Sequence, residues 1–316
     1  MQVEYSNFSL MQVLHNFDRL IKDGCVHTYM QQMLLTVRPS TDFEIPHSDG
    51  YQLYSSLLAI MRSSDPATSQ HVHDSEISSV AVSGLSGRFG SGTRPGHKKI
   101  NAGRTYQFHI GITDPNEIEI FRSLIRSLIL EGMDIDLEAG SLRIEEVNSS
   151  VLTFEELMGE VSRYDGRAIE FLFMSPACIQ YGNSSVTEMF PHRTAVFNSL
   201  LSKWNHVCPE EFKMSVSRDE FARYLAEKPD AKSYDTHSVM VNTVHDAKRG
   251  HPRPIFKQGF TGRCAYRFVR DAPQDVRNAV VALAMFAEYS GVGSSVGRGC
   301  GWVRVKMGAE VREVRK

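Results

Sequence analysis

Gly291-Val-Gly-Ser-Ser-Val-Gly-Arg-Gly-Cys-Gly301 is a loop with five glycines in eleven residues, placed between an apolar helical stretch and a closing strand. Phosphate-binding loops of nucleotide enzymes run in the order strand, glycine loop, helix, so that the phosphate lies at a helix N-terminus. Here the loop follows the helix, and its spacing matches neither GxGxxG nor the Gly-Lys-Ser/Thr ending of a P-loop. Because glycine lacks a Cβ and tolerates positive φ, the loop is expected to approach another backbone or an extended ligand such as RNA.

The segments around this loop predict one folding unit. Apolar side chains spaced by 2 residues predict strands and those spaced by about 3.6 residues predict helices. The expected strands are 169–174, 239–244, 259–268 and 302–305, and the expected helices are 190–204 and 273–288. This order, β-α-β-β-α-β, is that of a ferredoxin-like domain.

The first half of the chain repeats the order. The expected strands are 31–38, 77–82, 105–112 and 142–147, and the expected helices are 51–61 and one that starts at Asp114. That start has Pro115 at the first helical position and Glu117 to complete a capping box. We therefore predict an α+β protein with two tandem ferredoxin-like (RRM-like) domains, at 31–150 and 164–316. An amphipathic helical extension is expected at 1–30 and a linker at 148–163.

Charge is unevenly distributed along the 316 residues. The formal net charge is -2, yet three acid-free windows hold 15 of the 35 lysines and arginines. The windows lie between Glu76 and Asp114, between Asp246 and Asp271, and from Tyr289 to Ala309. Cations gathered in this way are typical of a localised phosphate-binding surface.

Other features restrict the class of protein. The five cysteines are scattered without CxxC or Cys/His metal spacing, so we expect a reduced cytoplasmic setting, no structural metal and no cofactor. The longest apolar run, Ala279 to Ala287, is much shorter than the roughly 20 residues of a membrane-spanning helix. We expect no membrane partner and no secretory signal.

Three segments in this order resemble the CRISPR-associated endoribonucleases that process precursor CRISPR RNA, members of the repeat-associated mysterious protein (RAMP) superfamily. They are Gly259-Phe-Thr-Gly-Arg-Cys-Ala-Tyr-Arg-Phe268, Phe286-Ala-Glu-Tyr-Ser-Gly-Val-Gly293 and Gly299-Cys-Gly-Trp-Val-Arg-Val305. The resemblance implies two ferredoxin-like domains, of which the first carries a catalytic histidine and the second binds RNA. It also implies metal-independent cleavage of CRISPR repeat RNA, with 2′,3′-cyclic phosphate and 5′-hydroxyl ends.

The resemblance also indicates where the catalytic histidine lies. In the family it follows the first helix of the first domain, and Ser63-Ser-Asp-Pro66 followed by His73-Asp74 is similar to that segment. His73 is the first candidate for general acid or base, and His71 is the alternative if the segment is shifted. Some relatives have a second histidine before that helix, and His47 occupies this place. A histidine suits the proton transfers because its ordinary pKa is near neutral.

The chain departs from the family pattern at two places. Many relatives have a tyrosine inside the first helix and a lysine after the catalytic histidine, where this chain has Leu58 and Ser79. A noncatalytic RNA-binding subunit of a CRISPR effector complex is therefore the alternative, with other subunits of that complex as partners. A tandem ferredoxin-like protein that binds other RNA or a small metabolite is a third hypothesis. The expected RNA-binding residues are Arg88, Lys98, Lys99, Arg263, Arg267, Gly293, Gly297, Arg298 and Gly299.

Overall fold

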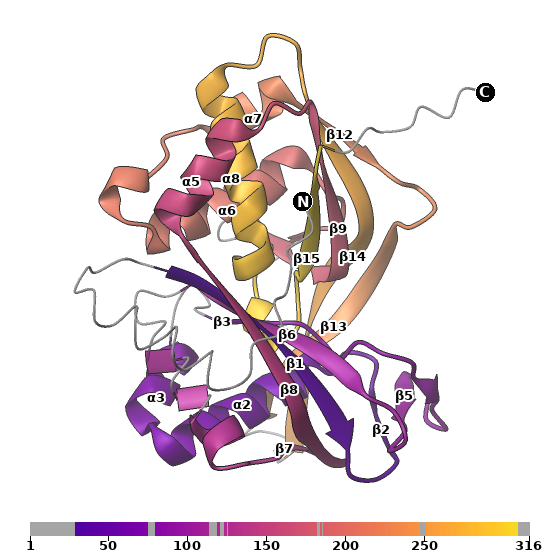
Figure 1. Ribbon diagram of the computed structural model, residues 1–316. Coiled ribbons are helices and arrows are strands. Elements are labelled where there is room, and N and C mark those ends of the chain that lie inside the picture. The colour runs from indigo at the N-terminus through magenta and orange to yellow at the C-terminus, as the bar shows by residue number, and fades with distance from the viewer. Residues whose placement is uncertain are drawn as a thin grey trace.

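The structure is a computed structural model that describes residues 29–74, 80–113, 119–120, 123–124, 126–181, 184, 186–246 and 251–308. The chain forms two units, each built on an antiparallel sheet, which lie one above the other in Figure 1. The α+β class expected from the sequence is confirmed. The predicted extension, up to residue 28, and the predicted helix start at Asp114 lie outside the described residues.

The first unit contains a sheet of order β3-β6-β1-β8-β7. Its central strand β1 pairs antiparallel with β6 on one side and β8 on the other. Tyr106, Phe108, Ile110 and Ile112, predicted on one face, are all fully buried in the first core. The elements are β1 (Tyr29–Pro39), α2 (Gly50–Ser64), α3 (Pro66–Asp74), β3 (Val80–Val82), β6 (Tyr106–Ile112), the π-helix η1 (Arg126–Leu130), β7 (Ile135–Leu137) and β8 (Gly140–Thr153).

A small three-stranded sheet lies beside this unit, and none of its strands is among those expected from the sequence. It has the order β2-β5-β4, formed by β2 (Phe43–Pro46), β4 (Gly90–Ser91) and β5 (His97–Ile100). Each strand is too short for a clear alternation, but Ile45 and Ile100 are fully buried. These two side chains fix the small sheet onto the first core.

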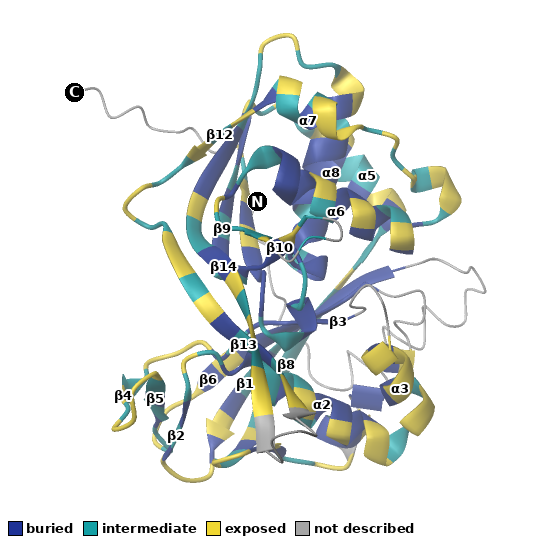
Figure 2. Ribbon diagram, turned by 180° about the vertical axis from the view of Figure 1, so that it is seen from behind, coloured by how far each residue is buried: buried dark blue, intermediate teal, exposed yellow. Residues whose placement is uncertain are grey.

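The second unit has a sheet of order β12-β14-β9-β15, and β13 also pairs with β14. Helices α5 (Phe154–Arg163), α6 and α8 cover one face, and Figure 2 shows how much of α8 is buried. Phe171, Phe197, Trp204, Tyr266 and Phe286 fill the core between helices and sheet. The elements are β9 (Ala168–Ala177), β10 (Ile179–Gln180), β11 (Thr187–Glu188), α6 (Arg193–Val207), η2 (Glu210–Phe212), α7 (Arg218–Tyr224), β12 (Leu225–Pro229), β13 (Asp235–Asp246), β14 (His251–Phe268), α8 (Gln274–Ser290), η3 (Val296–Arg298) and β15 (Val303–Met307).

The segment 148–163, expected as a linker, is regular structure. It consists of the end of β8 and the helix α5 (Phe154–Arg163). Thr153 is the last residue of β8 and the N-cap of α5, where it forms a capping box with Glu156. Leu157 and Val161 pack into the second core. The connection is ordered because the helix has both a cap and an apolar face.

The two units pack closely against one another. A Cβ on Gly111 of β6 would lie 2.0 Å from the carbonyl oxygen of Tyr289 in α8, so only glycine fits there. The His109 and Trp302 rings, from β6 and the second unit, are 4.6 Å apart. The Gln32 side chain of β1 donates to the carbonyl of Glu288 at 3.0 Å. These contacts hold the two sheets at a set separation.

Candidate functional site

A cavity of about 280 Å³ lies where the two units meet. It combines the start of α2, the loop after β3, strands β5 and β6, the end of β9, part of β13 and the glycine loop. Its lining residues are His47, Ser48, Asp49, Gly50, Ser83, Gly84, Leu85, Ser86, Lys98, His109, Met174, Ser175, Pro176, Val239, Arg298, Gly299, Trp302 and Arg304.

His47 enters this cavity from the turn between β2 and α2, and it is exposed. Its backbone N–H donates to the carbonyl of Gly96 at 2.9 Å. Two residues later, the buried Asp49 carboxylate accepts the Leu85 N–H at 3.2 Å and forms an ion pair with Lys98 at 3.0 Å. Burial raises the pKa of Asp49 above its ordinary value. These contacts fix the backbone that carries His47 and leave its imidazole accessible.

The glycine loop closes the cavity by direct contact with α2. A Cβ on Gly299, whose φ is +86°, would lie 2.6 Å from the Cα of Gly50, the first residue of α2. Gly297 lies against Tyr54 and the Val80 carbonyl, and Gly293 against the Cys178 carbonyl. The close approach predicted from the glycine spacing is therefore made, at these positions, to other parts of the same chain.

Two arginines bring positive charge to the cavity. The Arg298 guanidinium is 5.8 Å from the centre of the Tyr54 ring, and Arg304 is exposed on β15. Burial, together with the charge of Arg304, lowers the pKa of His109 to about 4. His109 is therefore neutral at neutral pH, and the positive charge that acts on it is that of Arg304.

The positive charge continues along the open face of the second sheet. Arg263 of β14 and Arg304 of β15 both lie opposite Leu172 of β9, so the three side chains share one face. Arg263 and Arg304 are exposed, and Arg267 lies half-buried four residues further along β14. Lys306 on the same face is 3.6 Å from Glu170. A row of cations thus leads from the sheet face to the cavity.

His73 and His71 lie elsewhere, on the helix α3, which is not among the helices expected from the sequence. Both are exposed, and neither lines the cavity. His73 Nδ1 is 2.9 Å from the Asp74 carboxylate. Burial raises the pKa of Tyr54, and Asp74 adds to this while Arg298 opposes it. The Asp74 carboxylate at the end of α3 is thus close enough to Tyr54 to affect the pKa of its hydroxyl.

The other predicted RNA-binding residues have different surroundings. Lys98 is buried, with its ammonium over the Phe89 ring at 4.1 Å and ion-paired to Asp49. Lys99 forms an ion pair with Asp42 at 3.0 Å. Arg88 is exposed, and its carbonyl accepts a bond from Arg104 at 2.8 Å. Through its ion pair with Asp49, Lys98 therefore stabilises the turn that carries His47.

Sequence reasoning did not single out Tyr54, His109 or Arg304. Leu58, at the position compared with the family tyrosine, is buried in the first core, and Ser79 lies outside the described residues. Tyr54 is one helical turn before Leu58 and faces the glycine loop. His109 lies on the polar face of β6, and this face contacts the second unit. The polar face is the sequence signal that could have pointed to His109.

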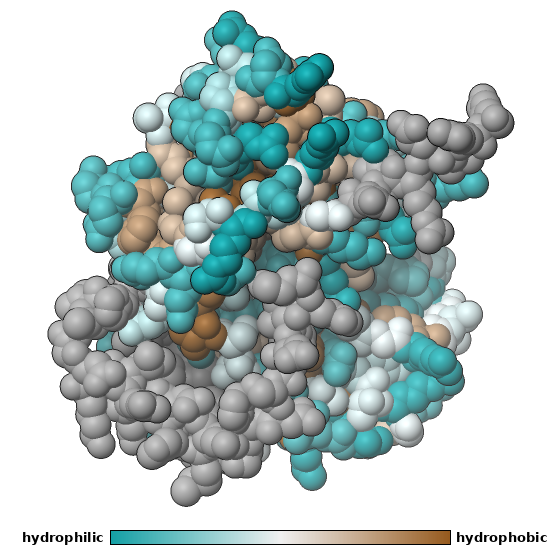
Figure 3. Space-filling view, turned by 45° about the horizontal axis from the view of Figure 1, so that its top comes forward, coloured by the Kyte–Doolittle hydropathy of each residue, from teal (hydrophilic) through white to brown (hydrophobic). Residues whose placement is uncertain are grey.

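The described part of the chain has no group of three or more His, Cys, Asp or Glu side chains placed to hold a metal ion. None of its helices has the length and apolar character needed to cross a membrane. Among the coloured residues of the face seen in Figure 3, hydrophilic ones predominate and apolar ones form smaller patches.

Comparison with known proteins identifies similar structures. Residues 171–303, from β9 to the start of β15, match the family model CRISPR-associated endoribonuclease Cas6. The fold is similar to that of a solved Cas6 product complex, with 18% identity, a TM-score of 0.66 and coverage of 88% of this chain and 100% of that chain. Thermus thermophilus Cas6 gives 17% identity, a TM-score of 0.59 and coverages of 88% and 98%. A Cas6-related protein from Pyrococcus furiosus gives 13% identity and a TM-score of 0.58, with coverage of 88% of this chain and 98% of that chain.

No curated protein sequence matches the chain. The resemblance to CRISPR-associated endoribonucleases expected from the sequence is confirmed by the family model over residues 171–303 and by these structures. The similarity of fold extends over both units, and the solved relatives have tandem ferredoxin-like domains.

Proposed function

We propose that this protein is an endoribonuclease that binds CRISPR repeat RNA and cleaves precursor CRISPR RNA without a metal ion. The observation that carries the proposal is one cavity in which an accessible histidine meets the arginines of the glycine loop and β15. The family match over residues 171–303 and the fold shared with a Cas6 product complex support the RNA substrate.

The chemistry requires little from the protein because the nucleophile is part of the substrate. The ribose 2′-hydroxyl attacks the adjacent phosphate, and the 5′-oxygen of the next nucleotide leaves. The protein aligns these atoms, moves protons and stabilises the charge that develops on the phosphate oxygens. The products are a 2′,3′-cyclic phosphate and a 5′-hydroxyl.

His47 is proposed as the general acid or base. It is the one of the three candidate histidines that lines the cavity, and its backbone is held by the Gly96 carbonyl and the Asp49 ion pair. Arg298 and Arg304 are proposed to stabilise the phosphate charge. Arg263 and Arg267 are proposed to bind RNA phosphates along the open sheet face. His73 and His71 remain the alternatives for proton transfer.

Incubation of the protein with the CRISPR repeat RNA of the same genome, in excess EDTA, tests this proposal. We expect cleavage at one position and products with cyclic phosphate and 5′-hydroxyl ends. A scrambled RNA of the same composition is the control. Tight binding of the repeat without scission would favour a noncatalytic subunit of an effector complex, and equal binding of scrambled RNA would contradict repeat recognition.

A further inference from the structure

A second cavity, of about 460 Å³, lies against the other half of the glycine loop. Gly293 to Ser295 line it, whereas Arg298 and Gly299 line the His47 cavity. Ser295 and Arg298 are three residues apart, a chain length of at most roughly 11 Å. The lining residues are Ile179, Gln180, Tyr181, Thr194, Ala195, Asn198, Ser199, Ser202, Lys203, Arg218, Gly293, Ser294 and Ser295. We call this cavity the recess.

The recess combines a flat cationic surface with polar groups. The Arg218 guanidinium lies over the Tyr181 ring, 5.2 Å from its centre. Asn198 and Ser202 are exposed on α6 and bring an amide and a hydroxyl to the lining of the recess. Among the described residues that line the recess, none carries a carboxylate. Aromatic rings and guanidinium planes stack on nucleobases, while amides and hydroxyls hydrogen-bond to base edges.

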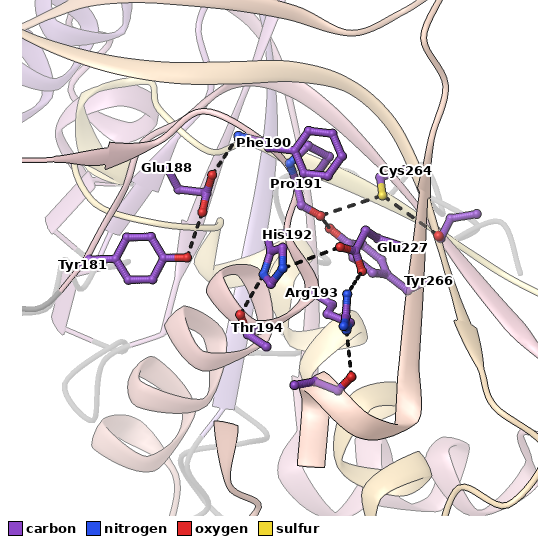
Figure 4. A network of polar contacts seen from close by, with 12 residues as sticks. Tyr181, Glu188, Phe190, Pro191, His192, Arg193, Thr194, Glu227, Cys264 and Tyr266 are labelled. Carbon is purple, nitrogen blue, oxygen red and sulfur yellow. Dashed lines mark hydrogen bonds and ion pairs between the residues drawn. The ribbon is translucent and has the colours of Figure 1, made fainter. Parts of the chain in front are cut away.

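The walls of the recess are held by hydrogen bonds, several of which are drawn in Figure 4. The Tyr181 hydroxyl donates to Glu188 at 2.8 Å, and the other carboxylate oxygen of Glu188 accepts the Phe190 N–H at 3.2 Å. Thr194 and His192 are joined by a hydrogen bond of 2.7 Å. A site whose groups are already positioned loses less conformational freedom when a ligand binds.

The floor of the recess is tied to the glycine loop. Lys203 is buried, and its ammonium donates to the carbonyls of Ser290 and Gly291 at 3.1 and 3.0 Å. The N–H of Gly293 donates to the Ser199 hydroxyl at 3.1 Å. The loop half that faces the recess is therefore fixed by α6.

Ser295 adds an observation of a different kind. Its φ is +59°, which makes it the one described residue other than glycine in the left-handed region. A side chain in that conformation is costly, and such strain is concentrated at ligand-binding and catalytic positions. Glycine is abundant in this loop, yet this left-handed position, one of the three loop positions that line the recess, carries a hydroxyl.

From these contacts we infer that the recess binds one unpaired nucleotide of the same RNA whose phosphate is cleaved in the His47 cavity. The inference rests on the proposed function. The volume of the recess is within the range of roughly 300–1,000 Å³ that is usual for small-molecule sites. Arg218 and Tyr181 stack on the base, while Asn198 and Ser202 contact its edge. The recess therefore contributes to repeat selection at a position away from the cleaved bond.

A set of synthetic repeat RNAs tests this inference, each with a single abasic nucleotide. Ser202→Trp fills the recess from an exposed position of α6, and His206→Trp, exposed on the same helix and outside the recess, is the control. For the wild type, we expect one abasic position to weaken binding by about tenfold. Ser202→Trp should bind the intact repeat about tenfold more weakly and be insensitive to that abasic position, whereas His206→Trp should behave as the wild type.

Cleavage at saturating RNA, measured in the same series, separates the two proposals. Normal wild-type cleavage together with a Ser202→Trp variant that binds every RNA as His206→Trp does would overturn the recess alone. If the wild type neither binds nor cleaves the repeat, the proposed function falls and the inference falls with it.

Discussion

The cavity at His47 and the end of α3 at His73 both offer a histidine, but they are built in different ways. The His47 cavity is assembled from both units, and Asp49, Lys98 and the Gly50–Gly299 contact hold it together. His73 lies on a short helix, and its ring contacts the carboxylate of its neighbour Asp74. The two histidines therefore differ in the long-range contacts that position them, a difference that their places along the chain do not reveal.

The largest expected effect separates the two histidines directly. His47→Ala should slow single-turnover cleavage of repeat RNA by roughly 100-fold or more, because general acid–base catalysis is lost. RNA binding should be retained, as measured by fluorescence anisotropy. His73→Ala is the matched variant and should cleave at nearly the wild-type rate. The reverse result would move the catalytic site to the end of α3.

The loss of protein stability at acid pH distinguishes the buried His109 from the exposed His73. The pKa of His109 is lowered to about 4 in the folded protein, mainly by burial, so the unfolded chain takes up a proton first as pH falls below 6.5. His109 should therefore reduce the free energy of unfolding by up to about 3 kcal/mol between pH 6.5 and pH 4. Urea denaturation of the wild type and His109→Gln at several pH values should show this difference. His73→Gln should follow the wild-type pH dependence, and a parallel loss in His109→Gln would contradict the assignment.

The contact between the units can be tested at Gly111. Gly111→Ala places a methyl group against the Tyr289 carbonyl and should lower stability by about 2 kcal/mol, as measured by thermal denaturation. Gly159 on α5 has open space around its Cα, so Gly159→Ala should be neutral or slightly stabilising. Equal stability of the two variants would mean that the units are less closely packed than described here.

The smallest expected effect concerns RNA affinity. Arg304→Ala should weaken RNA binding by about fivefold, since one phosphate contact is lost. The slope of log affinity against log salt concentration should fall in magnitude by about one. Arg62, exposed in the last turn of α2 close to α3, is the matched control and should show neither change on mutation to alanine. If Arg62→Ala has the larger effect, the RNA passes over α3 and not over the sheet face.

Periodicity predicted the elements that build the two cores. The spacing of Leu53, Leu57 and Met61 predicted α2, and the alternation from Tyr106 to Ile112 predicted β6, because one buried face imposes a regular pattern. Helix α3 was missed because only Ser69 and Val72 of its nine residues are buried. Strands β2, β4 and β5 were missed because they are two to four residues long.

The candidate site was less predictable than the fold. The resemblance placed His73 first and His71 and His47 behind it, since nothing local distinguishes an accessible histidine in a cavity from one on a helix end. The roles of Tyr54, His109 and Lys98 depend on residues far away in the sequence, namely Arg298, Trp302 and Asp49. Such pairings arise from how the two units meet, which periodicity within one element does not report.

The join between β8 and α5 has a mechanical consequence. Thr153 ends the strand and caps the helix, so no free residue separates the two units at this point to serve as a pivot. Swinging one unit away from the other would require breaking the capping box or the β1–β8 ladder. We therefore expect the two units to keep a nearly constant separation when RNA binds, without a hinge motion that opens and closes the site.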